Sequence, residues 1–457
     1  MKSHRRPTKT ARIEIVDLAY NGKAVGRLDG KVVFLNSGLP GETVLARITK
    51  EKARYCEGRT IEIIRRSDER IDSPCNHFGE CGGCTWLDLD YARQLHYKRR
   101  QVVDCLRHIG RFEDIDVADI VPSREQFYYR NKMEFSANAA DGTAFTLGLH
   151  RRGRFDEIFD VTDCLLQSTI SNEILARFRE YMIRYHVPAY HVSDHTGYMR
   201  FLVIREGKNT GQIMLNVVTG DGELPGKDDL VASLTDAFPG ITTIVHNITT
   251  RISNVARGER ELIIYGDGYI VDELLDRSFK IYANSFFQTN TRQAETLYAA
   301  ALDMLDVSSS DRLLDLYCGT GTIGLCIAAD VARVVGIDIE PAAIAAAEAN
   351  AADNGITNAE FHAAAAREIL SRRPELFTGL TGAVVDPPRA GLHPKVIRKL
   401  IELNFPKIVY ISCNPATFAR DAAIFADSNY RLSRIIPVDM FPHTMHVELV
   451  AGFKRKD

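Results

Sequence analysis

The pattern of hydrophobic and polar residues divides the 457-residue chain into distinct parts. Residues 11–66 hold five short runs rich in β-branched residues, separated by glycine-containing turns, and this spacing predicts a small β-barrel of the OB type. Residues 121–270 favour strands again. From about residue 280, strands and helices alternate, which is typical of a parallel α/β sheet. We therefore expect a basic disordered tail (1–10), a barrel (11–66), a central α+β domain (67–270) and a Rossmann-like α/β domain (280–457).

One long helix is predicted between the barrel and the central strands, over residues 88–111. Asp90 can cap its first turn, and Gly110 can end it. One face of this helix is strongly basic, and the other carries an apolar stripe made of Leu95, Val102, Val103 and Leu106. We expect the stripe to pack on the C-terminal domain.

The composition, 45% hydrophobic and 26% charged, is ordinary for a soluble protein. No apolar run approaches the roughly 18 residues that a membrane span needs. The first residues lack the apolar stretch of a secretory signal, so we expect a cytoplasmic protein. The net charge of −3 conceals a basic front, because residues 1–70 hold 16 Lys/Arg and 9 Asp/Glu, a net of +7 against −10 for the remainder. This asymmetry favours contact with a polyanion, with a solvated charged surface as the alternative.

Aromatic residues stand beside cations in three places, which are Lys50–Tyr55, Phe127–Lys132 and His150–Arg154. Such pairs suit stacking on unpaired bases together with phosphate contacts, so the barrel and the central domain are expected to bind RNA. The alternatives are a salt-bridged surface and a barrel with no ligand.

Three of the nine cysteines lie close together, at Cys75, Cys81 and Cys84. An odd number of cysteines in a long chain without a secretory signal argues against a disulfide framework. A thiolate site needs four ligands, and Cys164 is the candidate for the fourth. Thiolate ligation suits zinc or an iron–sulfur cluster, and the distant fourth ligand favours the cluster. The C-x5-C-x2-C spacing departs from that of radical enzymes, so we expect a structural role.

The C-terminal domain begins with a strand, a glycine-rich turn and a helix over residues 311–324. Gly319, Gly321 and Gly324 fit the fingerprint of dinucleotide-binding sheets, and Asp338 ends the next strand, where an acid binds ribose hydroxyls. An enzyme that uses a nicotinamide cofactor is therefore a competing interpretation of these residues alone.

Three later residues bear on that choice. Asp386 follows the strand at 383–385, Cys413 follows the apolar run at 408–411, and Glu448 lies in a late strand. A cysteine at a strand end is commonly inert. Here, however, all three residues are expected at one edge of the sheet, so that a cofactor pocket, a nucleophile and a base lie close together. A hydride-transfer enzyme needs no such cysteine.

At five motifs the sequence resembles the RNA uracil-C5 methyltransferases, which form 5-methyluridine. The motifs occur in the family's order and are Ser285–Asn290, Asp315–Gly321, Asp386–Leu392, Ser412–Pro415 and His443–Glu448. The front is similar too, because residues 11–66 resemble a TRAM barrel and the four cysteines fall on the family's 4Fe-4S ligands. Barrel and cluster together are similar to the branch that acts on 23S ribosomal RNA, whereas the bacterial tRNA branch usually lacks both.

The resemblance implies a role for each site residue. Four residues would line the S-adenosylmethionine site, with Asp338 on the ribose, and these are Gln288, Tyr317, Asp338 and Asp386. Cys413 would attack C6 of uracil, and Glu448 would remove the C5 proton. The cluster would be held by Cys75, Cys81, Cys84 and Cys164. RNA is the implied partner, and the family default is a monomer.

Two positions depart from the family pattern. Ala365 stands where the family usually has an acidic residue that approaches the adenine, and Thr322 stands where some relatives have asparagine. Two alternatives stay open, namely the same reaction on tRNA and an RNA-binding protein that has lost catalysis. Ala365 argues for lost catalysis, whereas the intact Cys413 and Glu448 argue against it.

Overall fold

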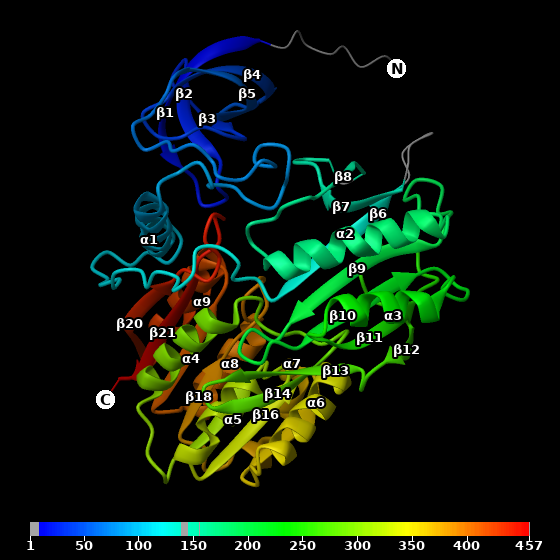
Figure 1. Ribbon diagram of the computed structural model, residues 1–457. Coiled ribbons are helices and arrows are strands. Elements are labelled where there is room, and N and C mark those ends of the chain that lie inside the picture. Colours follow the sequence, from blue (N-terminus) through cyan, green and yellow to red (C-terminus); the bar gives the residue numbers. More distant parts are fainter. Residues whose placement is uncertain (1–8, 139–144, 155, 457) are drawn as a thin grey trace, which may run out of the picture.

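The computed structural model describes residues 9–138, 145–154 and 156–456, so most of the expected basic tail lies outside the described residues. Figure 1 shows the barrel at one end, the central sheet beside it, and the C-terminal α/β domain below both. The fold prediction of an OB-like barrel, a central α+β part and a Rossmann-like domain is confirmed. Among the described residues, no helix has the length and apolar character needed to cross a membrane.

The barrel is closed, with strand order β1-β2-β3-β5-β4. Its interior is filled by aliphatic side chains such as Ile13, Val33 and Val44, all of which are fully buried. Trp86 and Tyr97 extend this core beyond the barrel, and so join it to the segment that follows. The strands are β1 (Thr10–Leu18), β2 (Ala24–Leu28), β3 (Lys31–Leu35), β4 (Thr43–Glu51) and β5 (Tyr55–Arg65).

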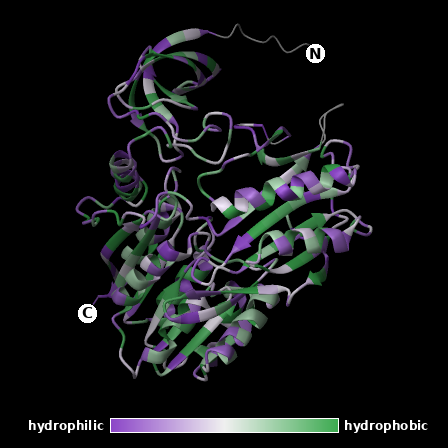
Figure 2. Cartoon of the chain, in the orientation of Figure 1, coloured by the Kyte–Doolittle hydropathy of each residue, from purple (hydrophilic) through white to green (hydrophobic). Residues whose placement is uncertain are grey.

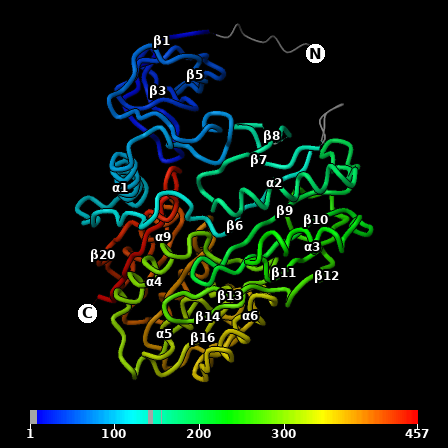
Figure 3. The backbone as a smooth tube through the Cα atoms, viewed as in Figure 1, coloured from blue at the N-terminus to red at the C-terminus, as the bar shows by residue number. Residues whose placement is uncertain are grey.

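The predicted helix is α1 (Tyr91–His108), which begins and ends three residues inside the expected bounds. Asp90 caps it as expected, because its side chain accepts hydrogen bonds from the backbone N–H groups of Ala92 and Arg93. Val102 and Leu106 are fully buried in the core of the C-terminal domain. Figure 1 shows α1 between the barrel and β20 (Tyr430–Val438), and the backbone tube in Figure 3 shows α1 beside the C-terminal part of the chain.

The central sheet has seven strands in the order β12-β11-β10-β9-β6-β7-β8. Helices α2 (Thr169–Arg184) and α3 (Lys227–Ala237) pack together on one face of it (Figure 1). Figure 2 shows its long strands as mostly hydrophobic, as expected of a sheet with a covered face. The strands are β6 (Lys132–Asn138), β7 (Thr146–His150), β8 (Ile158–Asp160), β9 (Met199–Glu206), β10 (Ile213–Thr219), β11 (Ile241–Ile248) and β12 (Arg260–Tyr265).

A separate hairpin joins the central sheet to the C-terminal domain. Its strands are β13 (Tyr269–Leu274) and β14 (Arg277–Tyr282), which pair antiparallel. Ile270 and Phe279 are fully buried in a core shared with Met214 of the central sheet and Ala294 of the C-terminal domain. The hairpin therefore occupies the boundary that was expected between residues 270 and 280.

The C-terminal sheet has the order β17-β16-β15-β18-β19-β21-β20, in which the first five strands are parallel, β21 is antiparallel to β19, and β20 is antiparallel to β21. One face is covered by α4, α5 and α6, and the other by α1, α7, α8 and α9. This is the expected doubly wound arrangement. The strands are β15 (Arg312–Leu316), β16 (Arg333–Asp338), β17 (Ala359–Ala363), β18 (Gly382–Val385), β19 (Lys407–Ser412), β20 (Tyr430–Val438) and β21 (Glu448–Arg455). The helices are α4 (Thr291–Leu305), α5 (Thr322–Ile327), α6 (Pro341–Asp353), α7 (Ala366–Arg372), α8 (Pro394–Leu403) and α9 (Pro415–Ala426), with short 3₁₀ turns at Ala328–Asp330 and Pro374–Phe377.

Candidate active site

The predicted catalytic residues meet at the carboxyl edge of the parallel strands. Asp338 ends β16, Asp386 follows β18, and Cys413 follows β19. Since β21 runs antiparallel to β19, its first residue lies at this same edge. Ser412 pairs with Leu449 in that ladder, which puts Cys413 and Glu448 one step further along on neighbouring strands.

The loop that carries Cys413 is tightly bonded to itself and to the next helix. The Ser412 hydroxyl accepts a hydrogen bond from the Asn414 backbone N–H (3.1 Å). Asn414 then caps α9, because its Oδ1 accepts from the backbone N–H groups of Ala416 (3.1 Å) and Thr417 (3.3 Å). The strand therefore stops at Ser412, and the half-buried Cys413 is left just ahead of a helix N-terminus.

Burial and like charges control the protonation of the site. Burial, followed by the charges of Glu448 and Asp386, raises the pKa of Cys413 to about 11. Burial and the charge of Asp386 raise the pKa of Glu448 to about 8. Asp386 has a pKa raised to about 7 by burial and by Asp315. Arg389 opposes the first two shifts, and it was not among the residues predicted from sequence. The thiol is thus mostly protonated in the free protein.

The glycine-rich turn is built around Asp338. Gly319 and Gly321 have φ values of +55° and +78°, which residues with a side chain rarely adopt. The Asp338 Oδ2 atom accepts from the Gly319 N–H (3.0 Å), and its Oδ1 accepts from the Glu340 N–H (2.9 Å). Tyr317 precedes the turn with a φ of +68°. Its pKa is raised to about 12 by burial and by nearby carboxylates that include Asp338, so the structure brings both predicted cofactor residues together.

Gln288 reaches this edge from the loop before α4. Its side chain lowers the pKa of the buried Tyr298 hydroxyl, which burial first and the charge of Asp386 second raise well above its ordinary value. The Asn131 side chain, from the central domain, donates to the Gln288 backbone oxygen (2.7 Å). The Gln288 loop is therefore held between the central and C-terminal domains.

Two further residues of the cofactor region stand at the departures from the family pattern. Ala365 immediately precedes α7, and no side chain caps that helix. Thr322 opens α5, with its hydroxyl 3.5 Å from that of Thr320. Asp315 is almost fully buried, with Oδ2 accepting from the Gly324 N–H (2.8 Å) and Oδ1 without a partner among the described residues.

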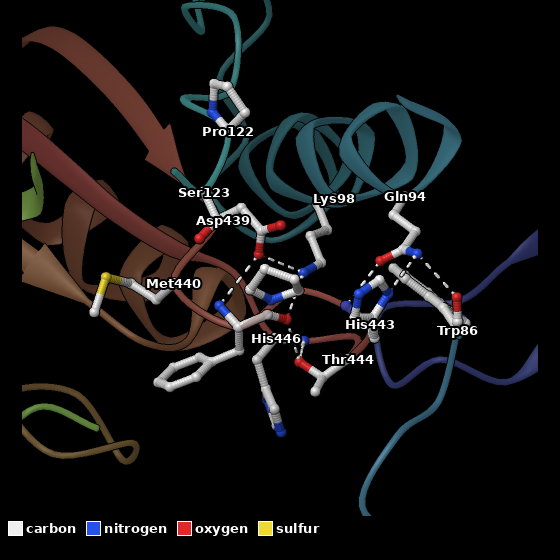
Figure 4. A network of polar contacts seen from close by, with 12 residues as sticks. Trp86, Gln94, Lys98, Pro122, Ser123, Asp439, Met440, His443, Thr444 and His446 are labelled. Atoms are coloured by element: carbon white, nitrogen blue, oxygen red, sulfur yellow. Dashed lines mark hydrogen bonds and ion pairs between the residues drawn. The ribbon is translucent and has the colours of Figure 1, made fainter. Parts of the chain in front are cut away.

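A buried ion pair anchors the segment that leads to Glu448. Lys98 Nζ lies 2.6 Å from Asp439 Oδ1, and both side chains are 0% exposed. Lys98 also donates to the backbone oxygen of Phe441 (2.9 Å), while the Tyr91 hydroxyl donates to Asp439 Oδ2 (3.0 Å). Figure 4 shows Lys98 reaching from α1 to this segment. No local sequence pattern indicated the pair, because its members are 341 positions apart.

A second contact with α1 holds the same segment one turn further along (Figure 4). The Gln94 amide donates to His443 Nδ1 (3.2 Å) and accepts from the His443 backbone N–H (2.9 Å). Phe127 stacks on the His443 ring at 4.6 Å between centroids. Burial lowers the pKa of His443 to about 4, so the ring is neutral near pH 7. The neutral ring and its backbone N–H thus tie this segment to Gln94 and Phe127.

The four predicted cluster cysteines line one cavity of about 360 Å³. Burial and the charges of the other three thiols raise the pKa of Cys84 to about 12. Cys81 and Cys164 show pKa values raised from the same causes. No group of three or more His, Cys, Asp or Glu side chains within the described ranges is placed to hold a metal ion. All nine cysteines are described and none forms a disulfide, as expected.

The predicted RNA-binding segments have mixed surroundings. Phe127 stacks on His443, in the segment that leads to Glu448. Within His150–Arg154, by contrast, Arg151 pairs with Glu80 and Arg154 pairs with Glu157. On the barrel, Lys50 pairs with Glu57 at 3.2 Å. The salt-bridged alternative thus describes the contacts of these cations in the protein alone.

Comparisons with known proteins agree with the geometry of the site. A family model described as tRNA (Uracil-5-)-methyltransferase matches residues 236–456, and a TRAM domain model matches residues 5–61. An uncharacterized RNA methyltransferase of Chlorobaculum tepidum is 39% identical over 464 residues, covering 97% of this chain and 96% of its own. Another, from Halalkalibacterium halodurans, is 34% identical and covers 97% of both chains. The chain belongs to the RNA uracil-5-methyltransferase family.

Among solved structures, this methyltransferase is similar to the Pyrococcus abyssi tRNA (uracil-54, C5)-methyltransferase in complex with S-adenosyl-L-homocysteine. The TM-score is 0.79 at 32% identity, with 97% of this chain and 99% of that chain covered. Family membership confirms the resemblance that the five motifs carried. It also shows that the competing nicotinamide-enzyme interpretation of the glycine-rich turn was wrong.

Proposed function

We propose that this methyltransferase transfers a methyl group from S-adenosylmethionine to C5 of a uridine in 23S ribosomal RNA. Cys413 is the nucleophile and Glu448 is the general base. The observation that carries this assignment is the β19–β21 register, which brings the two residues to the same point of the sheet edge. A cysteine beside a buried carboxylate, with Asp338 and the glycine-rich turn on the same edge, supports covalent catalysis next to a cofactor site.

The chemistry requires both groups. C5 of uracil is a weak nucleophile, so the Cys413 thiolate first forms a bond to C6, which pushes an electron pair toward C5 and the C4 carbonyl. C5 then takes the methyl group, and the sulfonium leaves as S-adenosylhomocysteine. Glu448 removes the C5 proton, and the electrons of that C–H bond restore the C5–C6 double bond as the C6–S bond breaks. The target base must leave its stack to reach the sulfur.

The electrostatics of the site fit this order of events. Burial first, and then the charges of Glu448 and Asp386, keep the thiol protonated, whereas Arg389 favours the thiolate. Glu448, with a pKa raised to about 8, holds and releases a proton close to neutral pH. This is the range in which a general base works well.

S-adenosylmethionine supplies an electrophilic methyl group when it is bound. Asp338, at the tip of β16, is placed to accept ribose hydroxyls, while Tyr317, Gln288 and Asp386 surround the same edge. Ala365 has no polar side chain to offer the adenine, so backbone groups take that role in this proposal.

The choice of 23S RNA rests on the barrel and the four cysteines. One observation favours tRNA as a second candidate, because a tRNA (uracil-54, C5)-methyltransferase covers nearly the full length of this chain. The barrel is therefore compatible with either RNA. Methylation of 23S RNA and of tRNA transcripts in parallel, with the product mapped by mass spectrometry, separates the two.

Cys75, Cys81, Cys84 and Cys164 are proposed to hold a structural 4Fe-4S cluster. Support comes from four thiols around one cavity, from their thiolate-only donor set, and from a volume larger than one ion needs. Arg130 also lines the cavity, and its charge opposes, without outweighing, the rise that burial gives to the pKa of Cys84 and Cys164. Zinc on the same thiolates is the alternative.

RNA that contains 5-fluorouridine tests the function directly, because fluorine at C5 cannot be removed as a proton and the covalent complex persists. The wild-type protein is expected to form a complex that survives denaturing electrophoresis, and Cys413→Ala is expected to form none. Cys105→Ala is the matched control, since burial also raises the pKa of that thiol to about 11. Equal methylation by wild type and Cys413→Ala would show that another group is the nucleophile.

A further inference from the structure

The turn between β1 and β2 of the barrel reaches the loop that carries the nucleophile. The Tyr20 hydroxyl donates to Asn414 Oδ1 at 2.8 Å, across 394 positions of sequence. Gly22, two residues further on, packs so closely that an added Cβ would lie 3.0 Å from Thr85 and 3.1 Å from Met445. The barrel thus contacts both the loop of Cys413 and the segment that leads to Glu448.

Helix α1 also contacts the end of β1 and the β1–β2 turn. Arg100 forms an ion pair with Asp17 (2.6 Å), and the Gln101 side chain donates to the Ala19 backbone oxygen (3.3 Å). Lys98, less than one turn earlier on the same helix, holds the segment before Glu448. Helix α1 therefore contacts both the β1–β2 turn of the barrel and the segment that leads to Glu448, and so fixes their relative positions.

Asn414 is the point at which three segments meet. Its Oδ1 accepts from Tyr20 as well as from the first N–H groups of α9. Its Nδ2 donates to the Arg389 backbone oxygen (2.9 Å). The side-chain amide therefore controls the start of α9, the position of Cys413 and the loop of the arginine whose charge favours the thiolate.

The environment of Tyr20 suits a hydrogen-bond donor. Its side chain is 37% exposed. Burial of the hydroxyl, followed by the charges of Cys105 and Cys413, raises its pKa to about 12, so the phenol stays protonated throughout the working range.

We propose that Tyr20 is a positioning residue for the nucleophile, and that the barrel completes the catalytic site. Its hydroxyl fixes the Asn414 amide, and through it the orientation of Cys413 and of the Arg389 loop. The inference rests on the proposed role of Cys413. It gives the barrel a second task besides contact with RNA.

The test is Tyr20→Phe, which removes one oxygen atom from the full-length protein. Two quantities are measured with 5-fluorouridine RNA: the first-order rate of covalent complex formation at saturating RNA, and the dissociation constant for the same RNA without fluorine. The rate is expected to fall about tenfold, the equivalent of one hydrogen bond, while the dissociation constant changes less than twofold. Tyr265→Phe, at 38% exposure on β12, is the matched control and is expected to leave both unchanged.

A double-mutant cycle with Asn414→Ser tests the path of the effect, since serine can still cap α9 but is too short to meet the phenol. Tyr20→Phe is expected to have no further effect in the Asn414→Ser background. A wild-type rate in Tyr20→Phe, a loss fully explained by weaker RNA binding, or independent effects of the two substitutions would each overturn the proposal. Methylation that persists in Cys413→Ala would instead overturn the proposed function on which it rests.

Discussion

Replacement of Glu448 by glutamine is expected to halt the reaction after the covalent step. Glutamine keeps the size of the side chain but cannot take the C5 proton. In the wild-type protein the pKa of Glu448 is raised to about 8, by burial first and by the charge of Asp386 second. At pH 7 about one carboxyl group in ten is then ionised. Release of the C5 proton is therefore expected to accelerate about fivefold from pH 7 to pH 8, and by about tenfold in all before it levels off above roughly pH 9.

The substitution has opposite effects on the two halves of the reaction. The charge of Glu448 helps to raise the pKa of Cys413, so its removal lowers the pKa of the thiol and does not slow attack on C6. Loss of the general base slows proton removal by a factor of about 10² to 10⁴. The protein is therefore expected to accumulate as a covalent complex on ordinary uridine RNA, with the methyl group already transferred.

Release of tritium from RNA labelled at C5 reports removal of the C5 proton, and denaturing electrophoresis measures the covalent complex. Glu402→Gln, on the exposed face of α8, is the control and should release tritium at the wild-type rate. Tritium release by Glu448→Gln within tenfold of wild type would show that a different group is the base. Lost turnover without a covalent complex would place the role of Glu448 before the attack on C6.

Three other predictions concern the supports of the site. Lys98→Met leaves the Asp439 carboxylate buried without its cation and should lower the free energy of unfolding by about 3–5 kcal/mol. The melting temperature should fall in this variant and be largely restored in Lys98→Met/Asp439→Leu. Equal melting temperatures of Lys98→Met and wild type would contradict this. Asp338→Ala should weaken the binding of S-adenosylhomocysteine, measured by calorimetry, by about 10- to 100-fold, because hydrogen bonds to a charged group are lost. The affinity for RNA should not change. A smaller loss would mean that other groups hold the ribose. Cys84→Ser, purified without oxygen, should lose iron and visible absorption that Cys105→Ser retains, whereas stoichiometric zinc in the wild type would refute the cluster.

The sequence alone predicts which residues meet at the edge of the C-terminal sheet, but it does not predict the contacts that hold those residues in place. Strand ends and turns are local signals, so the sequence alone predicts that Asp386, Cys413 and Glu448 lie at one edge of the sheet. The contacts of Tyr20 with Asn414 and of Lys98 with Asp439 join residues more than 300 positions apart. Neither contact can be recognised from a local sequence pattern, because a tyrosine in a turn and a lysine on a basic helix are both common.

Helix α1 also determines when during synthesis the site can form. Lys98 leaves the ribosome 341 residues before Asp439, and Glu448 follows only nine residues after that partner. Until the last few residues emerge, the nascent chain holds the barrel and the central sheet but no completed sheet edge with Glu448 beside Cys413. A product truncated before Asp439 would therefore leave Lys98 buried without its partner, and the C-terminal sheet expressed without α1 would leave the Asp439 carboxylate without the Lys98 cation.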